Sequence, residues 1–428
     1  MPVECRYYVP FFFVLMSLAR LLTGTVLALL MVFGLPERGW AQEDEGTVQV
    51  GAEGVRLASP DGAFEVRLRN DLYIDARMLP GTDAAPGAER VYLRRVRPRL
   101  QGRVYERFAF SVRPDFSAGG PEIDDAYVEV RVAPSVRVRM GRFKVPVGLE
   151  SLQSTTGLMH VERGFPTGLV PGRDVGLMVA GEGGDGRLSY AAGLFNGAPG
   201  GTGGGADVDD AKEGAARLFA EPFASQEGAL SGLGVGVAGT WGHVTGTDAA
   251  PALTSLRTTG RQTFFEYRAG AQADGTRWRV APQARLYAGP VELLGEYTVA
   301  GQDVRQGVAE ETLTHQAWQA SASVVLTGED AREGAVVPQD PFAAERGLGA
   351  FELGVRVHGA SFDEATFPTF ASPDTAAEAR AWGGTLSWYP NRMVRFMLGV
   401  ERTTFDTAGI ASPPGAETLL LFRTQLVF

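Results

Sequence analysis

The feature that most constrains this chain is a succession of short segments in which apolar and polar residues alternate. Phe64, Val66 and Leu68 alternate with charged neighbours in an early segment, and Phe422 and Leu426 continue the pattern near the end. A period of two residues is the signature of a β-strand with two unlike faces. The chain is therefore predicted to be all-β from about residue 63 to its last residue.

We predict sixteen strands, and their links mostly alternate between long and short. Short turns on one side and longer loops on the other are typical of outer-membrane barrels. In lipid every backbone N–H and C=O must be paired, so such a sheet has to close on itself. The expected fold is a 16-stranded antiparallel transmembrane β-barrel, with strands near 63–78, 90–104, 106–116, 123–133, 136–144, 173–181, 187–196, 214–223, 230–243, 277–287, 291–300, 314–327, 348–361, 379–389, 392–405 and 417–428.

One strand-like segment does not fit this count. Residues 264–268 have β character, but a seventeenth strand would place the two ends of the barrel on opposite sides. We therefore assign them to a long external loop, residues 244–276. The link over 328–347 then falls on the periplasmic side, where it is unusually long.

The first 41 residues form a separate unit. An apolar run from Leu21 to Leu35 and small residues at Gly39 and Ala41 describe a secretory signal peptide, with Met16 as an alternative start. An N-terminal membrane anchor is the other interpretation. Cleavage after Ala41 would leave a short acidic periplasmic segment, residues 42–62, ahead of the barrel. Cys5, the one cysteine, lies inside the signal, so no disulfide is expected.

The residue motifs of the chain resemble the phosphate-selective porin O and P family. The motifs include Gly-Arg-Phe-Lys-Val-Pro-Val-Gly-Leu-Glu over 141–150, Pro-Gly-Arg-Asp-Val-Gly over 171–176, Gly-Leu-Phe-Asn-Gly over 193–197 and Trp-Tyr-Pro-Asn over 388–391. The resemblance implies a homotrimeric 16-stranded porin in the outer membrane of a Gram-negative bacterium. It also implies passive uptake of small anions, phosphate being favoured, along an arginine-lined path, although members of the family vary in substrate.

The last residue adds an expectation about assembly. The final strand has alternate apolar residues and ends in the aromatic Phe428. This ending looks like the signal that the barrel-assembly machinery reads. The expected partners are thus that machinery, outer-membrane lipid and small anions.

Basic residues gather on the predicted inward face of the first five strands. They outnumber the acidic residues there, although the whole chain has a formal charge of −10. Guanidinium groups bind phosphate and carboxylate bidentately, and rings of arginine select anions in pores. The alternative is that each arginine only ties neighbouring strands together through a carboxylate. The candidate pore-lining residues are Arg67, Arg69, Arg95, Arg97, Arg99, Arg103, Arg137 and Arg139, while Arg94 has lipid-facing parity and is expected to reach the interface.

The link over 145–172 is predicted to fold inward and narrow the channel, as the corresponding loop does in general porins. Lys144, Arg163 and Arg173 are the candidate constriction residues, and His160 and Glu162 belong to the same loop. A lid on the outer surface is the alternative.

Other chemistry finds little support in the sequence. The four histidines have no metal-ligand spacing, and no Gly-x-Ser-x-Gly elbow is present, so neither a cofactor nor catalysis is expected. The Gly200–Gly205 tract resembles a flexible loop, because no helix follows to make it a phosphate cradle. The negative charge argues against nucleic acid. A weakly selective general porin, a non-transporting anchor or adhesin, and a soluble multi-sheet protein remain as alternatives.

Overall fold

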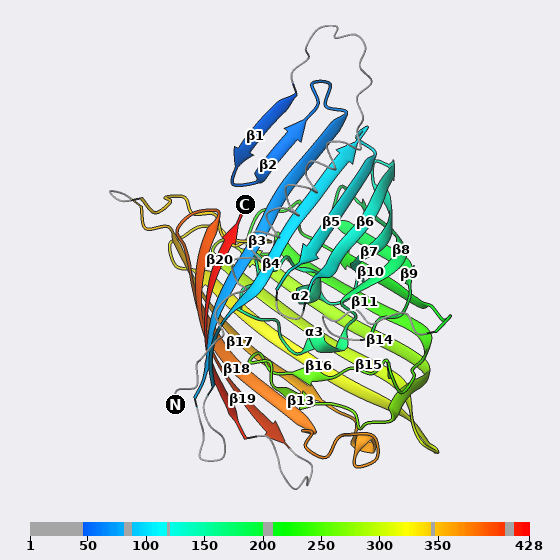
Figure 1. The fold of residues 1–428 in the computed structure, drawn as a ribbon. Helices are drawn as coiled ribbons and strands as arrows, with labels where there is room; N and C mark the ends of the chain where they lie inside the picture. The colour runs from blue at the N-terminus through cyan, green and yellow to red at the C-terminus, as the bar shows by residue number, and fades with distance from the viewer. Residues whose placement is uncertain (1–45, 81–87, 118–119, 200–208, 344–346, 407–414) are drawn as a thin grey trace, which may run out of the picture. The chain divides into compact units, whose positions relative to one another are not determined.

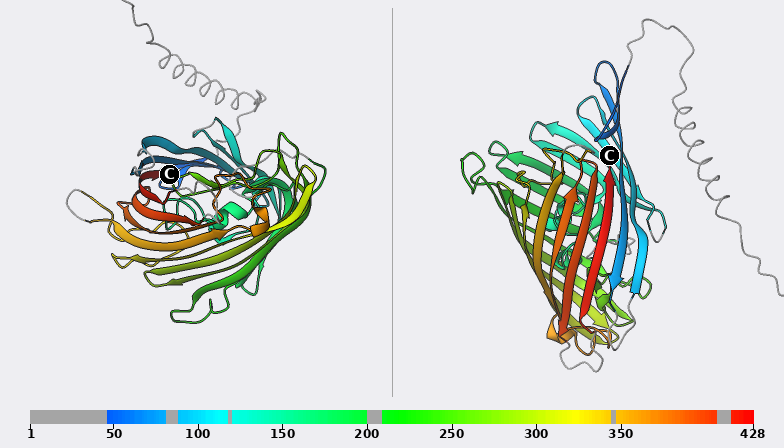
Figure 2. Two further views of the ribbon diagram at one scale, coloured as in Figure 1. Left: turned by 90° about the horizontal axis from the view of Figure 1, so that it is seen from below. Right: turned by 90° about the vertical axis from the view of Figure 1, so that its left-hand side faces the viewer.

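The computed structural model describes residues 46–80, 88–117, 120–199, 209–343, 347–406 and 415–428, and it shows a closed antiparallel barrel. Each wall strand pairs with the next along the chain, and β20 pairs with β3 to close the ring (Figures 1 and 2). The sixteen-stranded prediction is confirmed. The predicted signal peptide lies outside the described residues.

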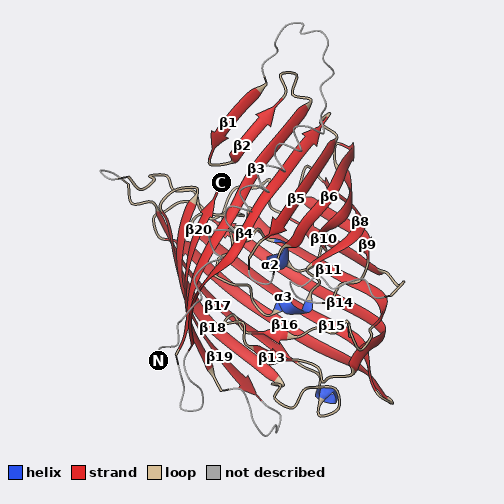
Figure 3. Cartoon of the chain, in the orientation of Figure 1, coloured by secondary structure: helices blue, strands red, loops and turns tan. Residues whose placement is uncertain are grey.

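The wall strands are β3 (Phe64–Leu79), β4 (Ala88–Val104), β5 (Phe108–Asp115), β6 (Glu122–Ala133), β7 (Val136–Lys144), β8 (Arg173–Gly183), β9 (Leu188–Phe195), β10 (Glu213–Ala220), β11 (Gly232–Thr245), β14 (Ala271–Ala288), β15 (Val291–Gln306), β16 (Ala309–Val325), β17 (Ala350–Ser361), β18 (Glu378–Tyr389), β19 (Val394–Asp406) and β20 (Glu417–Val427). Figure 3 shows how little helix accompanies them: α2 (Leu149–Leu152), α3 (Pro166–Leu169) and the 3₁₀ turn η1 (Glu364–Thr366). None of the described helices is long and apolar enough to cross a membrane.

Two links differ from their predicted form. β15 and β16 continue past their predicted limits and meet at a tight turn over 307–308, where a link of 301–313 was expected. The segment near 264–268 forms no wall strand. Its first residues make β13 (Thr263–Phe265), which pairs with β12 (Leu256–Arg257) in a hairpin inside the predicted external loop.

A hairpin that the sequence analysis did not predict precedes the barrel. β1 (Thr47–Gly51) pairs with β2 (Gly54–Ala58), and β2 pairs with the first part of β3. β20 pairs only with residues 71–78 of β3, so the hairpin continues the sheet beyond the end of β20. The first part of β3 thus lies next to the hairpin rather than along the closing seam.

Side chains alternate between the two faces of the wall as period two requires, and bulges interrupt the alternation at named places. Leu93 and Val91 are exposed on the outer face, whereas Arg95 and Arg97 are buried inside. The change of parity comes from a β-bulge, because Tyr73 pairs with Arg95 while Ile74 pairs with Leu93. The lipid-facing assignment of Arg94 is therefore wrong: the bulge turns its guanidinium inward.

Loops fill part of the barrel interior near the end that carries the long links. Phe165 belongs to the 145–172 link, Phe264 and Phe265 to β13, and Phe362 follows β17. The rings of Phe265 and Phe362 stack with their centroids 3.6 Å apart, and those of Phe165 and Phe264 are 5.1 Å apart. Together with Leu169 and Leu256 they make one buried apolar cluster that joins three loops.

Candidate functional site

Residues 145–172, called the inner loop below, run from the end of β7 to the start of β8 and carry α2 and α3. Figures 1 and 2 show both helices inside the ring of strands. Gly148 turns the chain into α2 with a φ of 82°, and a Cβ there would lie 2.9 Å from a methyl carbon of Val170. Only glycine meets both the backbone conformation and the close approach without strain.

Arginines from the opposite wall hold the inner loop by its backbone. Arg356 donates to the carbonyl of Glu162 (2.8 Å), and Arg395 donates to that of Leu158 (2.8 Å). Arg279 donates to the carbonyl of Leu169 (2.9 Å), and Arg423 to that of Val161. A loop whose carbonyls take these charge-assisted bonds is fixed along β14 to β20.

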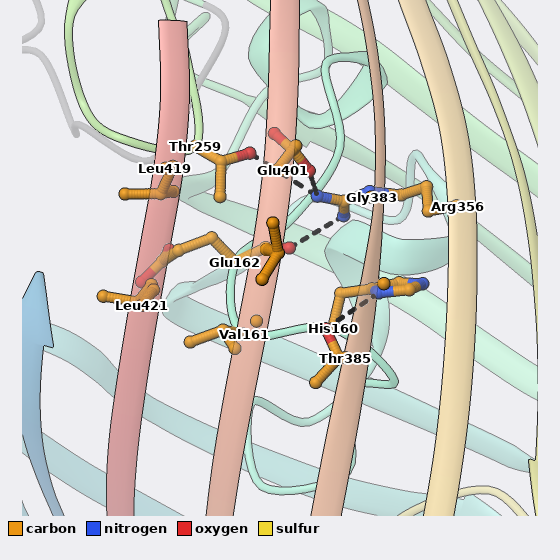
Figure 4. A pocket seen from close by; sticks show the side chains of 13 residues that line it. His160, Val161, Glu162, Thr259, Arg356, Gly383, Thr385, Glu401, Leu419 and Leu421 are labelled. Carbon is orange, nitrogen blue, oxygen red and sulfur yellow. Dashed lines mark hydrogen bonds and ion pairs between the residues drawn. The ribbon is translucent and has the colours of Figure 1, made fainter. Parts of the chain in front are cut away.

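Buried polar side chains add to this attachment (Figure 4). Arg356 forms an ion pair with Glu401 (2.7 Å) and reaches the loop from β17, while His160 of the loop lies 3.2 Å from the hydroxyl of Thr385. Burial lowers the pKa of His160 well below its ordinary value, and the positive charge of Arg356 lowers it further. His160 is therefore a neutral member of this network at neutral pH.

Glu162 joins the inner loop to the closing seam of the barrel. Its carboxylate accepts two bonds from Arg94 (2.7 and 2.9 Å) and contacts Arg423 (2.5 Å). Burial alone would raise the pKa of Glu162, but the two guanidiniums outweigh it and hold that pKa well below the ordinary range. The sequence predicts that Glu162 belongs to the loop, but it does not predict the partner Arg94. Arg94 faces inward only because of the bulge in β4.

A group of basic side chains, called the cationic cluster below, lies between the inner loop and the wall made by β4 to β8. Its seven members are Arg95, Arg97, Arg99, Arg113, Lys144, Arg163 and Arg173. The carboxylates next to them are Asp71, Asp115, Asp124 and Asp125 of the wall and Glu150 and Glu162 of the inner loop. Arg97 pairs with Asp115 (2.6 Å), and Arg173 pairs with Asp125 (2.7 Å). Seven cations thus face six carboxylates, so the cluster has a small excess of positive charge.

Four members of the cluster have no carboxylate within 4.0 Å among the described residues. Arg95 is 5% exposed and lies over the ring of Tyr73 at 5.6 Å, and Arg99 has no ion pair. Lys144 donates to the carbonyl of Gln153 (2.8 Å), and Arg163 donates to the same oxygen (2.9 Å). These four groups have hydrogen-bond donors that no carboxylate occupies.

The other candidate residues have carboxylate partners, and Arg69 among them lies directly opposite Arg99 in register. Arg67 and Arg103 contact Glu65 at 2.5 and 3.1 Å, on the part of β3 next to the β1–β2 hairpin. Arg69 lies on the same part and contacts Glu53 at 3.3 Å. On β7, Arg137 is 3.9 Å from Glu182, and Arg139 is 2.6 Å from Glu129. These five arginines tie strands and turns together.

Asp124 is a further residue that sequence reasoning missed. A second bulge, in which Arg113 pairs with Asp125 and Pro114 with Ile123, turns Asp124 inward beside Asp125. Two adjacent acidic residues in a strand that otherwise alternates were the available signal. In the described part of the chain, no group of His, Cys, Asp and Glu side chains could hold a metal ion.

A closed sixteen-stranded barrel with an inner loop and a charged interior defines the class of outer-membrane channel proteins. The chain belongs to the phosphate-selective porin O and P family, whose sequence model matches residues 64–428. Family and fold indicate a channel rather than an enzyme, and a location in a bacterial outer membrane. A comparison with curated proteins gave no match.

Solved structures share the fold at low identity. An anion-selective porin from Comamonas acidovorans has a TM-score of 0.52 and 10% identity, covering 85% of this chain and 100% of that chain. The outer membrane channel DcaP of Acinetobacter baumannii has a TM-score of 0.56 and 10% identity, with coverages of 86% and 98%. OmpT of Vibrio cholerae in a trimer form has a TM-score of 0.51 and 10% identity, with coverages of 86% and 100%.

Proposed function

We propose that this chain forms a water-filled channel for passive uptake of small anions, with phosphate as the preferred solute. The observation that carries the proposal is the cationic cluster, in which Arg95, Arg99, Lys144 and Arg163 have no carboxylate partner within 4.0 Å among the described residues. A cluster of fixed positive charge raises the local concentration of anions and repels cations. The match to the phosphate-selective family supports phosphate in particular. The planar guanidinium group of arginine can also bind two oxygens of one phosphate at once.

A general, weakly selective pore is the second candidate, and one observation favours it. Arg97, Arg113 and Arg173 form ion pairs with Asp115, Asp124 or Asp125, so part of the positive charge is neutralised. The two candidates differ in whether phosphate occupies a site. A true site saturates, whereas a weakly selective pore does not.

The decisive experiment is ion selectivity of the purified protein in a planar bilayer under a potassium chloride gradient, followed by titration with phosphate. We expect a chloride-selective reversal potential and a saturable block by phosphate. Arg95→Gln and Arg99→Glu should weaken both, because they remove unneutralised charge. Arg103→Gln is the matched control, since it removes an arginine that lies outside the cluster and contacts Glu65. Cation selectivity of the wild type, or no block at millimolar phosphate, would leave a pore without the anion path.

Assembly is a further part of the proposal. We infer a homotrimer, which the trimeric form among the structural neighbours supports. We also infer that Phe428 is read by the barrel-assembly machinery. The backbone of Phe428 pairs with that of Asn70, with N···O distances of 2.7 and 3.2 Å, so the last residue takes part in closing the barrel.

A further inference from the structure

We propose that the lumen holds a second solute site, on the periplasmic side of the inner loop, that binds organic carboxylates with an apolar body. The inference rests on the proposed channel function and adds a class of solute that the cationic cluster does not specify. The site is a cavity of about 310 Å³. It is lined by Leu149, Leu152 and Gln153 of the inner loop and by Arg217, Phe219 and Arg285 of the wall.

Its position in the barrel follows from the other lining residues. Gly186 and Arg187 belong to the short turn between β8 and β9, and Glu333 belongs to the link between β16 and β17. Both links lie at the end with the short turns, which is the periplasmic end of such barrels. A solute in this cavity has therefore already passed the inner loop, or has entered from the periplasm.

One apolar side chain at the cavity is partly exposed. Leu152, the last residue of α2, keeps accessible surface there, whereas Leu149 and Phe219 are already buried against Leu294 in a single cluster. Porin interiors are generally polar and wet. An apolar side chain beside the water path gives an organic solute something to bury that an inorganic ion lacks.

The cavity also holds an arginine that forms no ion pair among the described residues, although Glu182, Glu221 and Glu333 line the same cavity. Arg285 forms ion pairs with Glu221 (2.7 Å) and Glu333 (2.6 Å), so its charge is neutralised. Arg217 has no carboxylate within 4.0 Å among the described residues, and its one hydrogen bond, to Gln283, is long at 3.4 Å. Its Nε is buried and has no partner. The guanidinium lies 4.6 Å from the ring centre of Phe219, which fixes its orientation without using its donors.

Together these features fit one kind of ligand. A carboxylate would take the free donors of Arg217 while an attached ring or short alkyl chain covers Leu152. A small inorganic anion would bind the donors of Arg217 but would leave the apolar side chain uncovered. An uncharged apolar molecule would cover that side chain but would leave the donors of Arg217 free. The volume lies at the small end of the range for ligand pockets, which suits a single aromatic acid.

The probe is benzoate added on the periplasmic side of the channel in a planar bilayer, compared with acetate at equal concentration. We expect benzoate to block the chloride current saturably and acetate to block at least tenfold more weakly. Arg217→Gln should weaken benzoate block about tenfold, the factor for one charge-assisted hydrogen bond. Arg217→Lys should keep most of it, and Leu152→Ala should weaken benzoate block without changing that by acetate. Arg103→Gln is the matched control and should leave benzoate block unchanged, because Arg103 contacts Glu65 and lies outside both the cationic cluster and the cavity.

Equal block by benzoate and acetate, or unchanged benzoate block in both Arg217→Gln and Leu152→Ala, would overturn the site. A folded protein without any current would overturn the proposed channel function instead. In that case benzoate binding to the barrel in detergent, measured by calorimetry, tests the site by itself. Tenfold weaker binding to Arg217→Gln would support it, and equal affinity would refute it.

Discussion

Arg423 and Asp75 face each other across the closing seam of the barrel, joined by two N···O contacts of 2.7 Å. Their side chains are 1% and 0% exposed. Asp75 lies on β3 and Arg423 on β20, directly opposite in register. The same guanidinium contacts Glu162 of the inner loop. One arginine thus couples the closure of the sheet to the position of the loop inside it.

Replacing Arg423 by Gln should destabilise the folded barrel. Removing one partner leaves Asp75 buried without its counter-charge, a change that costs about 3–5 kcal/mol of unfolding free energy. Urea unfolding in lipid or detergent measures the loss. Arg56→Gln is the control, because Arg56 is more than a third exposed and should change stability by less than about 1 kcal/mol. Equal stability of the two variants would contradict the role of the seam pair.

Glu162→Gln should loosen the inner loop while the barrel remains closed. The amide cannot balance Arg94 and Arg423, so we expect larger and noisier single-channel conductance. Glu182→Gln is the control, since Glu182 is exposed and 3.9 Å from Arg137. Conductance of Glu162→Gln that matches the wild type in size and noise would argue against this attachment.

The lowered pKa of Glu162 predicts how the wild type responds to acid. The pKa of this carboxylate in the folded protein lies well below the ordinary value of about 4.3. A lowered pKa contributes stability that is present above about pH 4.3 and is lost only as the pH falls through the lower folded value. Conductance and noise should therefore stay constant between pH 8 and 5. A step within that range would show that another group controls the loop.

Gly157→Ala should disturb the contact between the inner loop and the β16–β17 link. A Cβ at Gly157 would lie 2.3 Å from the Cα of Gly334, so one backbone has to move. Overpacking of this kind costs about 1–3 kcal/mol. Gly183→Ala is the control, because nothing lies within 4 Å of its added Cβ. Urea midpoints of the two variants, each compared with the wild type, test whether the link and the loop touch.

Anion selectivity should weaken as salt rises. The screening length falls from about 10 Å at 0.1 M salt to about 3 Å at 1 M, so the fixed charges of the cationic cluster act over a shorter range. We expect the anion-to-cation permeability ratio to decrease steadily between these concentrations. A ratio that does not depend on salt would indicate selection by pore size rather than by charge.

The class of fold and the number of strands follow from the alternation of apolar and polar residues along the chain. Period two, as in Phe64 to Leu68, fixes which face of a strand is apolar, and only a closed sheet leaves no unpaired backbone in lipid. The inward location of Arg95, Arg97 and Arg99 followed from the same alternation, because no bulge separates these three. The ends of β15 and β16 at the turn between them could not be predicted in this way. Both strands continue there beyond the segments in which apolar and polar residues alternate.

Which arginines share a site, and which of them are neutralised, depends instead on how the folded barrel brings the strands and the inner loop together. A one-residue bulge turns Arg94 inward, another brings Asp124 beside Asp125, and neither can be read from a regular period. Arg356, Arg395 and Arg423 reach the inner loop from strands more than 190 residues away along the chain. The physical reason is that ion pairing depends on distances of a few ångströms between strands, and barrel closure sets those distances.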